Sequence, residues 1–423
     1  MTQVLKGHIV HAPALGRMDI TENGFLVLED GVIAGVYHTL PDCYAHAPLR
    51  DYGDKFIMQS FADMHLHAPQ YPMLGMGMDL PLLDWLNTYT FPTESRFADL
   101  DYARRTYRRL ASDLITNGTT RVAMFSSLHT EATWVLMEEL EKAGVTGYVG
   151  KVNMDRNGLP GVLQETTEES VRETLRWLEG CRFEHVKPIL TPRFTPSCTD
   201  ELMAALGRIA EEKGLYVQSH LSESIGEIQW VRELHPECKR YWETYDKYGL
   251  WKDHTLMAHC VHSDEVERKA IKDANVVVVH CGDSNVNICS GVCPVRRMLD
   301  EGIWVTLGSD IALLLLIALA APFMLFGLYE KNGQPLEKIL KNIIRVRFLA
   351  PAARPYRTEN RFAALERQEH FNKEVEKLVS IPNKTTGKDS RGLGTSRHPA
   401  RHKAVARRPQ AGGKSHKTGK KGR

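Results

Sequence analysis

The chain has 423 residues, of which 43% are hydrophobic and 8% aromatic, and its formal net charge is +2. These values are typical of a soluble globular protein, long enough for one large barrel or for two to three ordinary domains. The charge is unevenly distributed, because residues 383–423 hold 13 Lys or Arg against one acidic residue, whereas residues 1–382 hold 41 basic and 51 acidic ones. The body is therefore acidic and the tail strongly basic.

Cysteine usage and the N-terminus bear on the cellular compartment. The eight cysteines form no Cys-x-x-Cys pair, and the chain is far too long for a small domain held together by disulfides. The first 25 residues contain no basic stretch followed by a long apolar core, so no secretory signal is predicted. Together these features predict a cytoplasmic protein with reduced cysteines.

Residues 1–55 alternate in short apolar bursts. Two apolar runs flank the sequence Glu29-Asp30-Gly31, which is a hairpin signal. We therefore predict a small antiparallel β-layer over 1–55, one half of a β-sandwich. Such a layer needs a partner to bury its apolar face.

From residue 56 the pattern changes to buried strands that alternate with amphipathic helices. The predicted strands are 56–66, Thr119–Ser126, Gly147–Met154, Val186–Phe194, Leu215–Ser219, Thr255–His259, Asn275–Cys281 and Ile303–Leu307. The predicted helices are Leu100–Asn117, Glu131–Ala143, Glu168–Gly180, Asp200–Lys213, Ser224–Leu234, Asp264–Asp273 and Pro294–Glu301. Eight strands joined by helices predict an α/β fold, a (β/α)₈ TIM barrel over residues 56–330, with its site at the carboxyl ends of the strands.

Those strand ends carry a set of metal-binding residue types. His65 and His67 follow the first strand, and positions i and i+2 of a strand point to the same face. A His-x-His pair alone is more often two surface histidines, but His220 after the fifth strand and Asp310 after the eighth favour a shared site. Three imidazoles and one carboxylate can hold a single zinc or iron and leave a position open for water. Bound metal would lower the pKa of that water to about 7 and supply a hydroxide nucleophile.

Two further residues are predicted to serve proton transfer. Glu223 lies three residues beyond His220, close enough to stand beside the metal and to carry a proton to a leaving nitrogen, as hydrolytic deamination requires. His259, at the end of the sixth strand, could ligate the metal or hold the attacking water. The alternative for His259 is a hydrogen-bonded core histidine.

Polar and aromatic residues near the same strand ends could hold a heterocyclic substrate. Gln70 can donate to and accept from a heterocycle edge, and Arg193 can grip a carbonyl oxygen. The alternatives are a glutamine that caps a turn and an arginine in a surface ion pair. Phe194 and Trp85 offer flat faces for a purine, although aromatic residues at such positions are often core.

Several motifs together resemble the guanine deaminase family of the metal-dependent amidohydrolase superfamily. They are His65-Leu-His-Ala-Pro-Gln-Tyr-Pro, Asp79-Leu-Pro-Leu-Leu-Asp-Trp-Leu, Thr90-Phe-Pro-Thr-Glu, Thr191-Pro-Arg-Phe-Thr, Ser219-His-Leu-Ser-Glu, Met257-Ala-His-Cys, His280-Cys-Gly-Asp-Ser-Asn and Leu307-Gly-Ser-Asp. The likeness covers residues 1 to about 311. Gly282 is a small departure, since relatives often carry proline there. A different deaminase design is excluded, because His129-Thr-Glu131 is followed by no Pro-Cys-x-x-Cys.

The resemblance implies hydrolysis of guanine to xanthine and ammonia with one zinc per chain. It implies that the zinc is bound by His65, His67, His220 and Asp310, that Glu223 shuttles the proton and that His259 assists. It also implies that Gln70, Arg193 and Phe194 hold the base. An alternative by the same chemistry is deamination or dechlorination of another purine or of a triazine. A homodimer is a further expectation.

The family pattern is lost after Asp310. Residues 311–329 form an uncharged run of 19 residues, which as a helix would be about 28 Å long and could be a buried barrel helix or a membrane span. Residues 331–382 have helical periodicity, and 383–423 are predicted to be a disordered tail that could bind nucleic acid or an anionic surface. The abrupt change at 311 also suggests a chimeric coding sequence. A different class of function is therefore a non-catalytic, membrane- or nucleic-acid-associated barrel protein.

Overall fold

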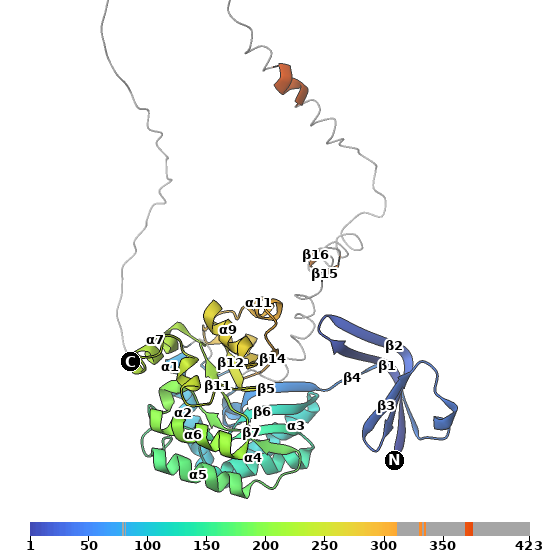
Figure 1. Cartoon of the computed structure of the whole chain (residues 1–423). Coiled ribbons are helices and arrows are strands. Elements are labelled where there is room, and N and C mark those ends of the chain that lie inside the picture. Colours follow the sequence, from blue (N-terminus) through green and yellow to red (C-terminus); the bar gives the residue numbers. More distant parts are fainter. Residues whose placement is uncertain (78–79, 81, 311–329, 332–333, 336–368, 375–423) are drawn as a thin grey trace, which may run out of the picture. The chain divides into compact units, whose positions relative to one another are not determined.

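The computed structural model describes residues 1–77, 80, 82–310, 330–331, 334–335 and 369–374 (Figure 1). The chain divides into two units, Met1–Ile343 and Ile344–Arg423, and in the second the described residues 369–374 are helical. β15 (Glu330–Lys331) and β16 (Gln334–Pro335) form a short antiparallel pair. The apolar run 311–329, most of the predicted helical segment 331–382 and the basic tail lie outside the described residues. Among the helices that are described, none has the length and apolarity to cross a membrane.

The N-terminal residues form a four-stranded sheet in the order β3-β2-β1-β4. Its strands are β1 (Thr2–Ala14), β2 (Arg17–Glu29), β3 (Val32–Tyr37) and β4 (Leu49–Met58). The predicted hairpin is confirmed, since β2 and β3 are joined by Asp30 and Gly31, both with the positive φ (49° and 82°) that a two-residue hairpin turn requires. The prediction of a purely antiparallel layer is wrong, because β4 runs parallel to β1 after a longer connection.

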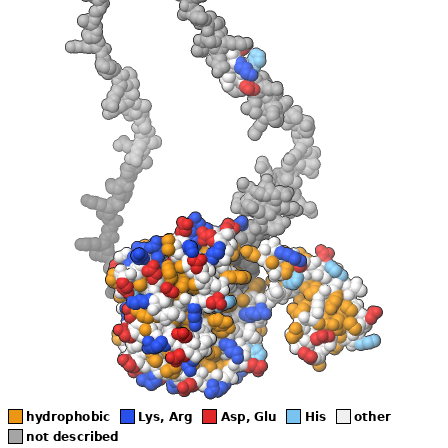
Figure 2. Space-filling view, viewed as in Figure 1, with side chains coloured by type: hydrophobic (Ala, Val, Ile, Leu, Met, Phe, Trp, Pro, Cys, Tyr) orange, Lys and Arg blue, Asp and Glu red, His pale blue; other side chains and the backbone are white. Residues whose placement is uncertain are grey.

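Apolar side chains of this sheet are unevenly buried. Val4 and Val27 are fully buried, whereas Val32 and Phe56 are 70% and 71% exposed. Figure 2 shows hydrophobic side chains gathered on the visible surface of this sheet. The sheet therefore buries only part of its apolar surface within the described residues.

The second sheet system is the predicted barrel (Figure 1). Its strands are β5 (Phe61–His67), β6 (Thr119–Phe125), β7 (Thr146–Gly150), β8 (Val152–Asn153), β9 (Val186–Pro188), β10 (Thr191–Pro192), β11 (Gln218–Leu221), β12 (Leu256–His259), β13 (Val277–His280) and β14 (Val305–Leu307). All neighbouring pairs are parallel. Parallel bridges from Leu190 to Val217 and from Leu66 to Asp310 join the two halves and close the ring. The (β/α)₈ fold is confirmed.

Helices follow the strands as predicted and lie outside them (Figure 1). They are α3 (Leu100–Thr116), α4 (Thr130–Ala143), α5 (Thr167–Gly180), α6 (Asp200–Lys213), α7 (Ile225–Leu234), α9 (Glu265–Asp273) and α11 (Val295–Asp300). Short elements that the sequence analysis did not predict are η2 (Ala68–Met73), α1 (Leu82–Trp85), η3 (Leu86–Thr90), α2 (Phe91–Ser95), η4 (Arg96–Ala98), α8 (Glu243–Asp246) and α10 (Gly282–Asn287). Five of them connect β5 to α3, and η3 is a π-helical turn, a feature that is frequent at functional sites.

The predicted strand boundaries need three corrections. The run 56–66 is divided between β4 and β5, because its first residues pair with β1 of the N-terminal sheet. The third and fourth predicted strands are each broken into two short pieces. The fifth spans Gln218–Leu221 rather than Leu215–Ser219, and because it ends later than predicted, His220 lies inside β11, not after it. Apolar runs mark burial, whereas the ladder hydrogen bonds that define a strand depend on the neighbouring strands.

Candidate active site

Four predicted ligands meet at the carboxyl ends of the barrel strands. His65 and His67 lie on β5, His220 on β11, and Asp310 follows β14. The Nε2 atoms of His67 and His220 are 3.0 Å apart, and Oδ1 of Asp310 lies 3.3 Å from Nε2 of His65 and 3.5 Å from Nε2 of His67. All four side chains are buried. We call these four residues the histidine–aspartate cluster.

The donor atoms of this cluster have the spacing of ligands to one metal. Two ligands of a tetrahedral zinc with bonds of about 2.0–2.1 Å lie about 3.3 Å apart, close to the observed 3.0–3.5 Å. The Nε2 atom of His65 is buried and has no hydrogen-bond partner among the described residues. A buried polar atom without a partner is costly. The cluster is therefore a candidate metal site.

Neighbouring groups fix how the cluster presents its atoms. The Nδ1–H of His220 donates to the backbone carbonyl of Arg193 over 2.6 Å, which leaves the Nε2 lone pair free to face the cluster. The Ser284 hydroxyl donates to Oδ2 of Asp310, so that Oδ1 faces the imidazoles. Such outer contacts orient metal ligands and fix the tautomer of a histidine.

Burial and charge favour the protonation states that a metal needs. Burial, followed by repulsion from the other imidazoles, lowers the pKa of His220 well below its usual value, and burial does the same for His67. Burial alone would raise the pKa of Asp310, but the close contact with His65 and the charge of the nearby imidazoles lower it well below its usual value. Neutral imidazoles and an ionised carboxylate are the forms that ligate divalent metals.

Glu223 and His259 stand next to this cluster. Oε2 of Glu223 lies 3.6 Å from Nε2 of His259, and Oε1 accepts a 3.1 Å hydrogen bond from the Ser290 hydroxyl. The imidazole of His259 stacks on that of His220, with ring centroids 5.4 Å apart. Burial, with the charge of Asp310 as the second cause, raises the pKa of Glu223 to about 8. A carboxyl group with a raised pKa can hold and release a proton near neutral pH.

Some residues at and beside the site have a left-handed backbone conformation. His259 and Asp310 have φ values of 74° and 56°, and Ser222, next to Glu223, has 48°. Residues other than glycine rarely adopt this region, and each instance costs of order 1–3 kcal/mol.

The side chain of Asn285 on α10 accepts a 2.7 Å hydrogen bond through Oδ1 from Nδ1 of His259. The fold therefore holds His259 in one orientation. The sequence analysis named Asn285 only as the last residue of a motif and gave it no role, and it did not name Ser290.

A pocket opens beside the cluster, and the four predicted substrate residues line it. Gln70 comes from η2, Trp85 from α1, and Arg193 and Phe194 follow β10. All four are buried, which excludes the surface ion pair considered for Arg193. The rest of the lining is His67, Leu82, Leu86, His220, Glu223, His259, Ile288 and Asp310.

One carboxylate that the sequence analysis did not single out lies behind this lining. Glu94 on α2 is 1% exposed and accepts hydrogen bonds from Gln70 and Arg193. Its only signal in the sequence was its place at the end of the motif Thr90-Phe-Pro-Thr-Glu. A single glutamate in an irregular segment has no pattern that reveals its burial.

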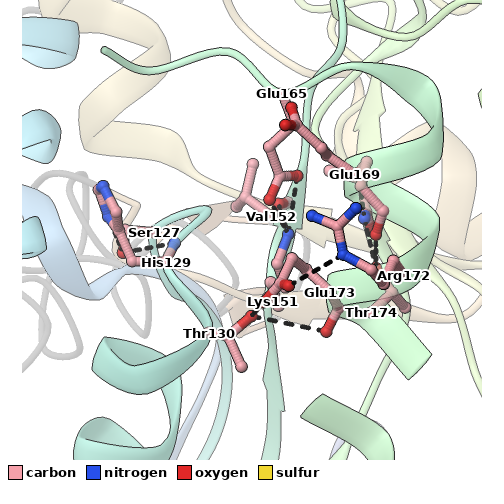
Figure 3. A network of polar contacts seen from close by, with 12 residues as sticks. Ser127, His129, Thr130, Lys151, Val152, Glu165, Glu169, Arg172, Glu173 and Thr174 are labelled. Atoms are coloured by element: carbon pink, nitrogen blue, oxygen red, sulfur yellow. Dashed lines mark hydrogen bonds and ion pairs between the residues drawn. The ribbon is translucent and has the colours of Figure 1, made fainter. Parts of the chain in front are cut away.

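A second polar network lies apart from the pocket (Figure 3). Lys151 is fully buried, and its Nζ donates to both carboxylate oxygens of Glu165 over 2.9 and 2.8 Å. His129 bonds to the Ser127 hydroxyl, and Thr130 donates to Glu173. These groups satisfy one another, and none of them lines the pocket described above. The network therefore reads as a structural element of the barrel.

Comparison with known proteins agrees with this architecture. Residues 56–367 match the Amidohydrolase family, and the matched region contains the barrel and every residue of the histidine–aspartate cluster. The chain belongs to the Amidohydrolase family.

Several proteins that the chain resembles are guanine deaminases by name. The guanine deaminase of Dictyostelium discoideum is 39% identical, with 73% of each chain covered, and that of Mus musculus is 38% identical, with 73% of this chain and 71% of the relative covered. A crystal structure of guanine deaminase from C. acetobutylicum with bound guanine in the active site is 46% identical, covers 74% of this chain and 75% of that one, and superposes with a TM-score of 0.72.

Proposed function

We propose that this chain hydrolyses guanine to xanthine and ammonia. The observation that carries the proposal is that one pocket is lined by members of the histidine–aspartate cluster, by Glu223 and His259, and by Gln70 and Arg193. Similarity to guanine deaminases and to a guanine-bound structure supports the same choice of substrate.

The histidine–aspartate cluster would hold one zinc. Bound zinc acidifies water, so that a nucleophile is available near neutral pH. The reaction forms a bond from the water oxygen to C2 of guanine and breaks the bond from C2 to the amino nitrogen. Both protons of the water must be transferred, one to ring nitrogen N3, which carries hydrogen in xanthine, and one to the amino nitrogen, which departs as ammonia.

Glu223 is suited to move those protons. Its carboxyl group is buried, and its raised pKa of about 8 allows it to accept a proton and to give it up again. His259, with Nδ1–H held by Asn285, presents the Nε2 acceptor toward Glu223 and can hold the attacking water through it. Gln70 and Arg193 would hold the ring, and Phe194 and Trp85 would cover its faces.

Guanine turnover and metal content of the full chain and its Glu223→Gln variant test the proposal. We expect about one metal per chain in both proteins and a loss of kcat of about 10²–10⁴-fold in the variant, because only the proton carrier is removed. Metal is measured by plasma mass spectrometry and product by xanthine absorbance. Guanine turnover no faster than turnover of adenine or an aminotriazine would refute the substrate, and full activity in the variant would refute the role of Glu223.

A further inference from the structure

The carboxylate of Glu94 does not line the pocket but is hydrogen-bonded to two polar residues that do. Arg193 donates to it twice, from Nη1 to Oε2 over 2.6 Å and from Nη2 to Oε1 over 3.0 Å. Gln70 donates from Nε2 to Oε1 over 2.9 Å. All three side chains are at most 3% exposed. An ion pair with two parallel hydrogen bonds in such a setting is geometrically specific.

The contact with Glu94 fixes which way the Gln70 amide faces. An ionised carboxylate only accepts hydrogen bonds, so the amide nitrogen of Gln70 must be the atom that faces Glu94. The amide oxygen then points elsewhere, and this buried Oε1 has no hydrogen-bond partner within the described part of the chain. Since Gln70 lines the pocket, its free acceptor is available to a ligand there.

The same carboxylate orients the Arg193 guanidinium. Two of its nitrogens each use one hydrogen on Glu94, and a guanidinium has five N–H groups. The remaining donors belong to a side chain that lines the pocket and whose guanidinium carbon lies 5.2 Å from the centre of the Phe91 ring. Gln70 and Arg193, which we call the recognition edge, thus offer an acceptor and a set of donors side by side.

We infer that Glu94 is a positioning residue that sets the donor–acceptor polarity of the recognition edge and thereby selects a purine with a ring N–H next to a carbonyl oxygen. This inference rests on the proposed function and deepens it. Guanine offers N1–H and O6. The base 2-aminopurine carries the same amino group on C2 but has a lone pair at N1 and no oxygen at C6, so it would oppose the Gln70 acceptor and leave Arg193 donors unpaired. Sites built on hydrogen bonds reject analogues that lack the matching group strongly.

The decisive measurement is the ratio of kcat/KM for guanine to that for 2-aminopurine in the full-length metal-loaded protein. The Glu94→Gln variant keeps the size of the side chain but lacks the two charged oxygens that accept hydrogen bonds from Arg193 and Gln70. We expect the ratio to fall by about 10–100-fold, mainly through loss of guanine turnover. A residue with a purely structural role would slow both substrates equally, and an unchanged ratio would overturn the inference.

The matched control is Glu139→Gln. Glu139 on α4 is also a buried carboxylate, accepts hydrogen bonds from Arg104 and Arg108 over 3.0 and 3.1 Å, and does not line the pocket. Its variant should lose some thermal stability and leave the substrate ratio unchanged. An equal fall of the ratio in this control would also overturn the inference, because loss of any buried carboxylate would then suffice.

Two further measurements keep the result decisive. If Glu94→Gln does not fold, Gln70→Leu removes the acceptor and leaves the pair of Glu94 and Arg193 intact, and an unchanged ratio there overturns the inference. Calorimetric binding of guanine and of 2-aminopurine to the unsubstituted chain and to Glu94→Gln separates this inference from the proposed function. The unsubstituted chain could bind guanine in preference to 2-aminopurine, the variant could lose this preference, and neither protein could turn guanine over. That result would support the inference and refute the proposed function.

Discussion

The histidine–aspartate cluster and the recognition edge are built in different ways. The histidine–aspartate cluster comes from the ends of barrel strands that lie up to 245 positions apart in the chain, and each member is placed by a ladder of backbone hydrogen bonds. The recognition edge comes from short helical turns and a loop, and its geometry depends on one buried carboxylate, Glu94. Backbone pairing between strands thus positions the metal ligands, whereas side-chain hydrogen bonds to one buried residue position the recognition edge.

Removal of a cluster residue should have the largest effect. The His220→Ala variant loses one of four donors whose partners remain buried, so we expect metal content well below one per chain and a loss of guanine turnover of at least about 10³-fold. The comparison variant is His185→Ala, since His185 is a half-exposed histidine paired with Glu141. Full metal content in His220→Ala would contradict the proposed ligand set.

Loss of the hydrogen bond between Asn285 and His259 should have a smaller effect. Asn285→Ala removes the acceptor that holds Nδ1–H of His259, so that the imidazole is free to rotate or to change tautomer. We expect kcat to fall about 10–100-fold, while KM for guanine and metal content stay within about twofold. Steady-state kinetics and metal analysis check this. A rise in KM with unchanged kcat would instead place Asn285 on the recognition side of the pocket.

Substitution of His129, which does not line the pocket, should change only the free energy of unfolding. Burial, followed by the nearby charge of Lys151, lowers the pKa of His129 to about 4. The unfolded chain, with a histidine pKa of about 6.5, therefore takes up a proton first as the pH falls, and the free energy of unfolding drops between pH 6.5 and 4. We expect His129→Gln to reduce the loss of stability between pH 7 and 5 by about 1–2 kcal/mol.

Urea unfolding at pH 7 and pH 5 measures this difference, with His185→Gln as the control. Guanine turnover at pH 7 should be unchanged in both variants, since neither residue lines the pocket. An identical loss of stability on acidification in His129→Gln and the unsubstituted chain would show that His129 is not the group responsible.

The sequence predicted the parts of the molecule that repeat a simple pattern. Alternation of apolar strands and amphipathic helices predicted the barrel, and the turn at Asp30 and Gly31 was visible because its φ values demand such residues. Polar residues at strand ends led to His65, His67, His220 and Asp310, which the structure brings together. The predicted strand boundaries were less accurate. The predicted strand 56–66 is divided between β4 and β5, because the pairing of β4 with β1 depends on a neighbouring strand and not on local composition.

The residues that hold the site in place left little trace in the sequence. Glu94, Asn285, Ser284 and Ser290 are common polar residues in short helices and loops, and their contacts to Gln70, Arg193, His259, Asp310 and Glu223 join segments that are distant in the chain. Hydrogen-bond partners of this kind are set by three-dimensional packing, for which spacing along the chain is no guide.

The sequence by itself thus determined the fold class and the chemical types present at the carboxyl ends of the strands, because periodic burial and residue chemistry are local properties. Only the tertiary structure decided which atoms face one another. It linked four donors by contacts of 3.0–3.5 Å, put the carboxyl group of Glu223 beside His259, and turned the amide of Gln70 so that its oxygen lacks a partner among the described residues. The first of these relations depends on the closing of the barrel, which brings residue 310 against β5, and the others on contacts between segments that are not adjacent in sequence.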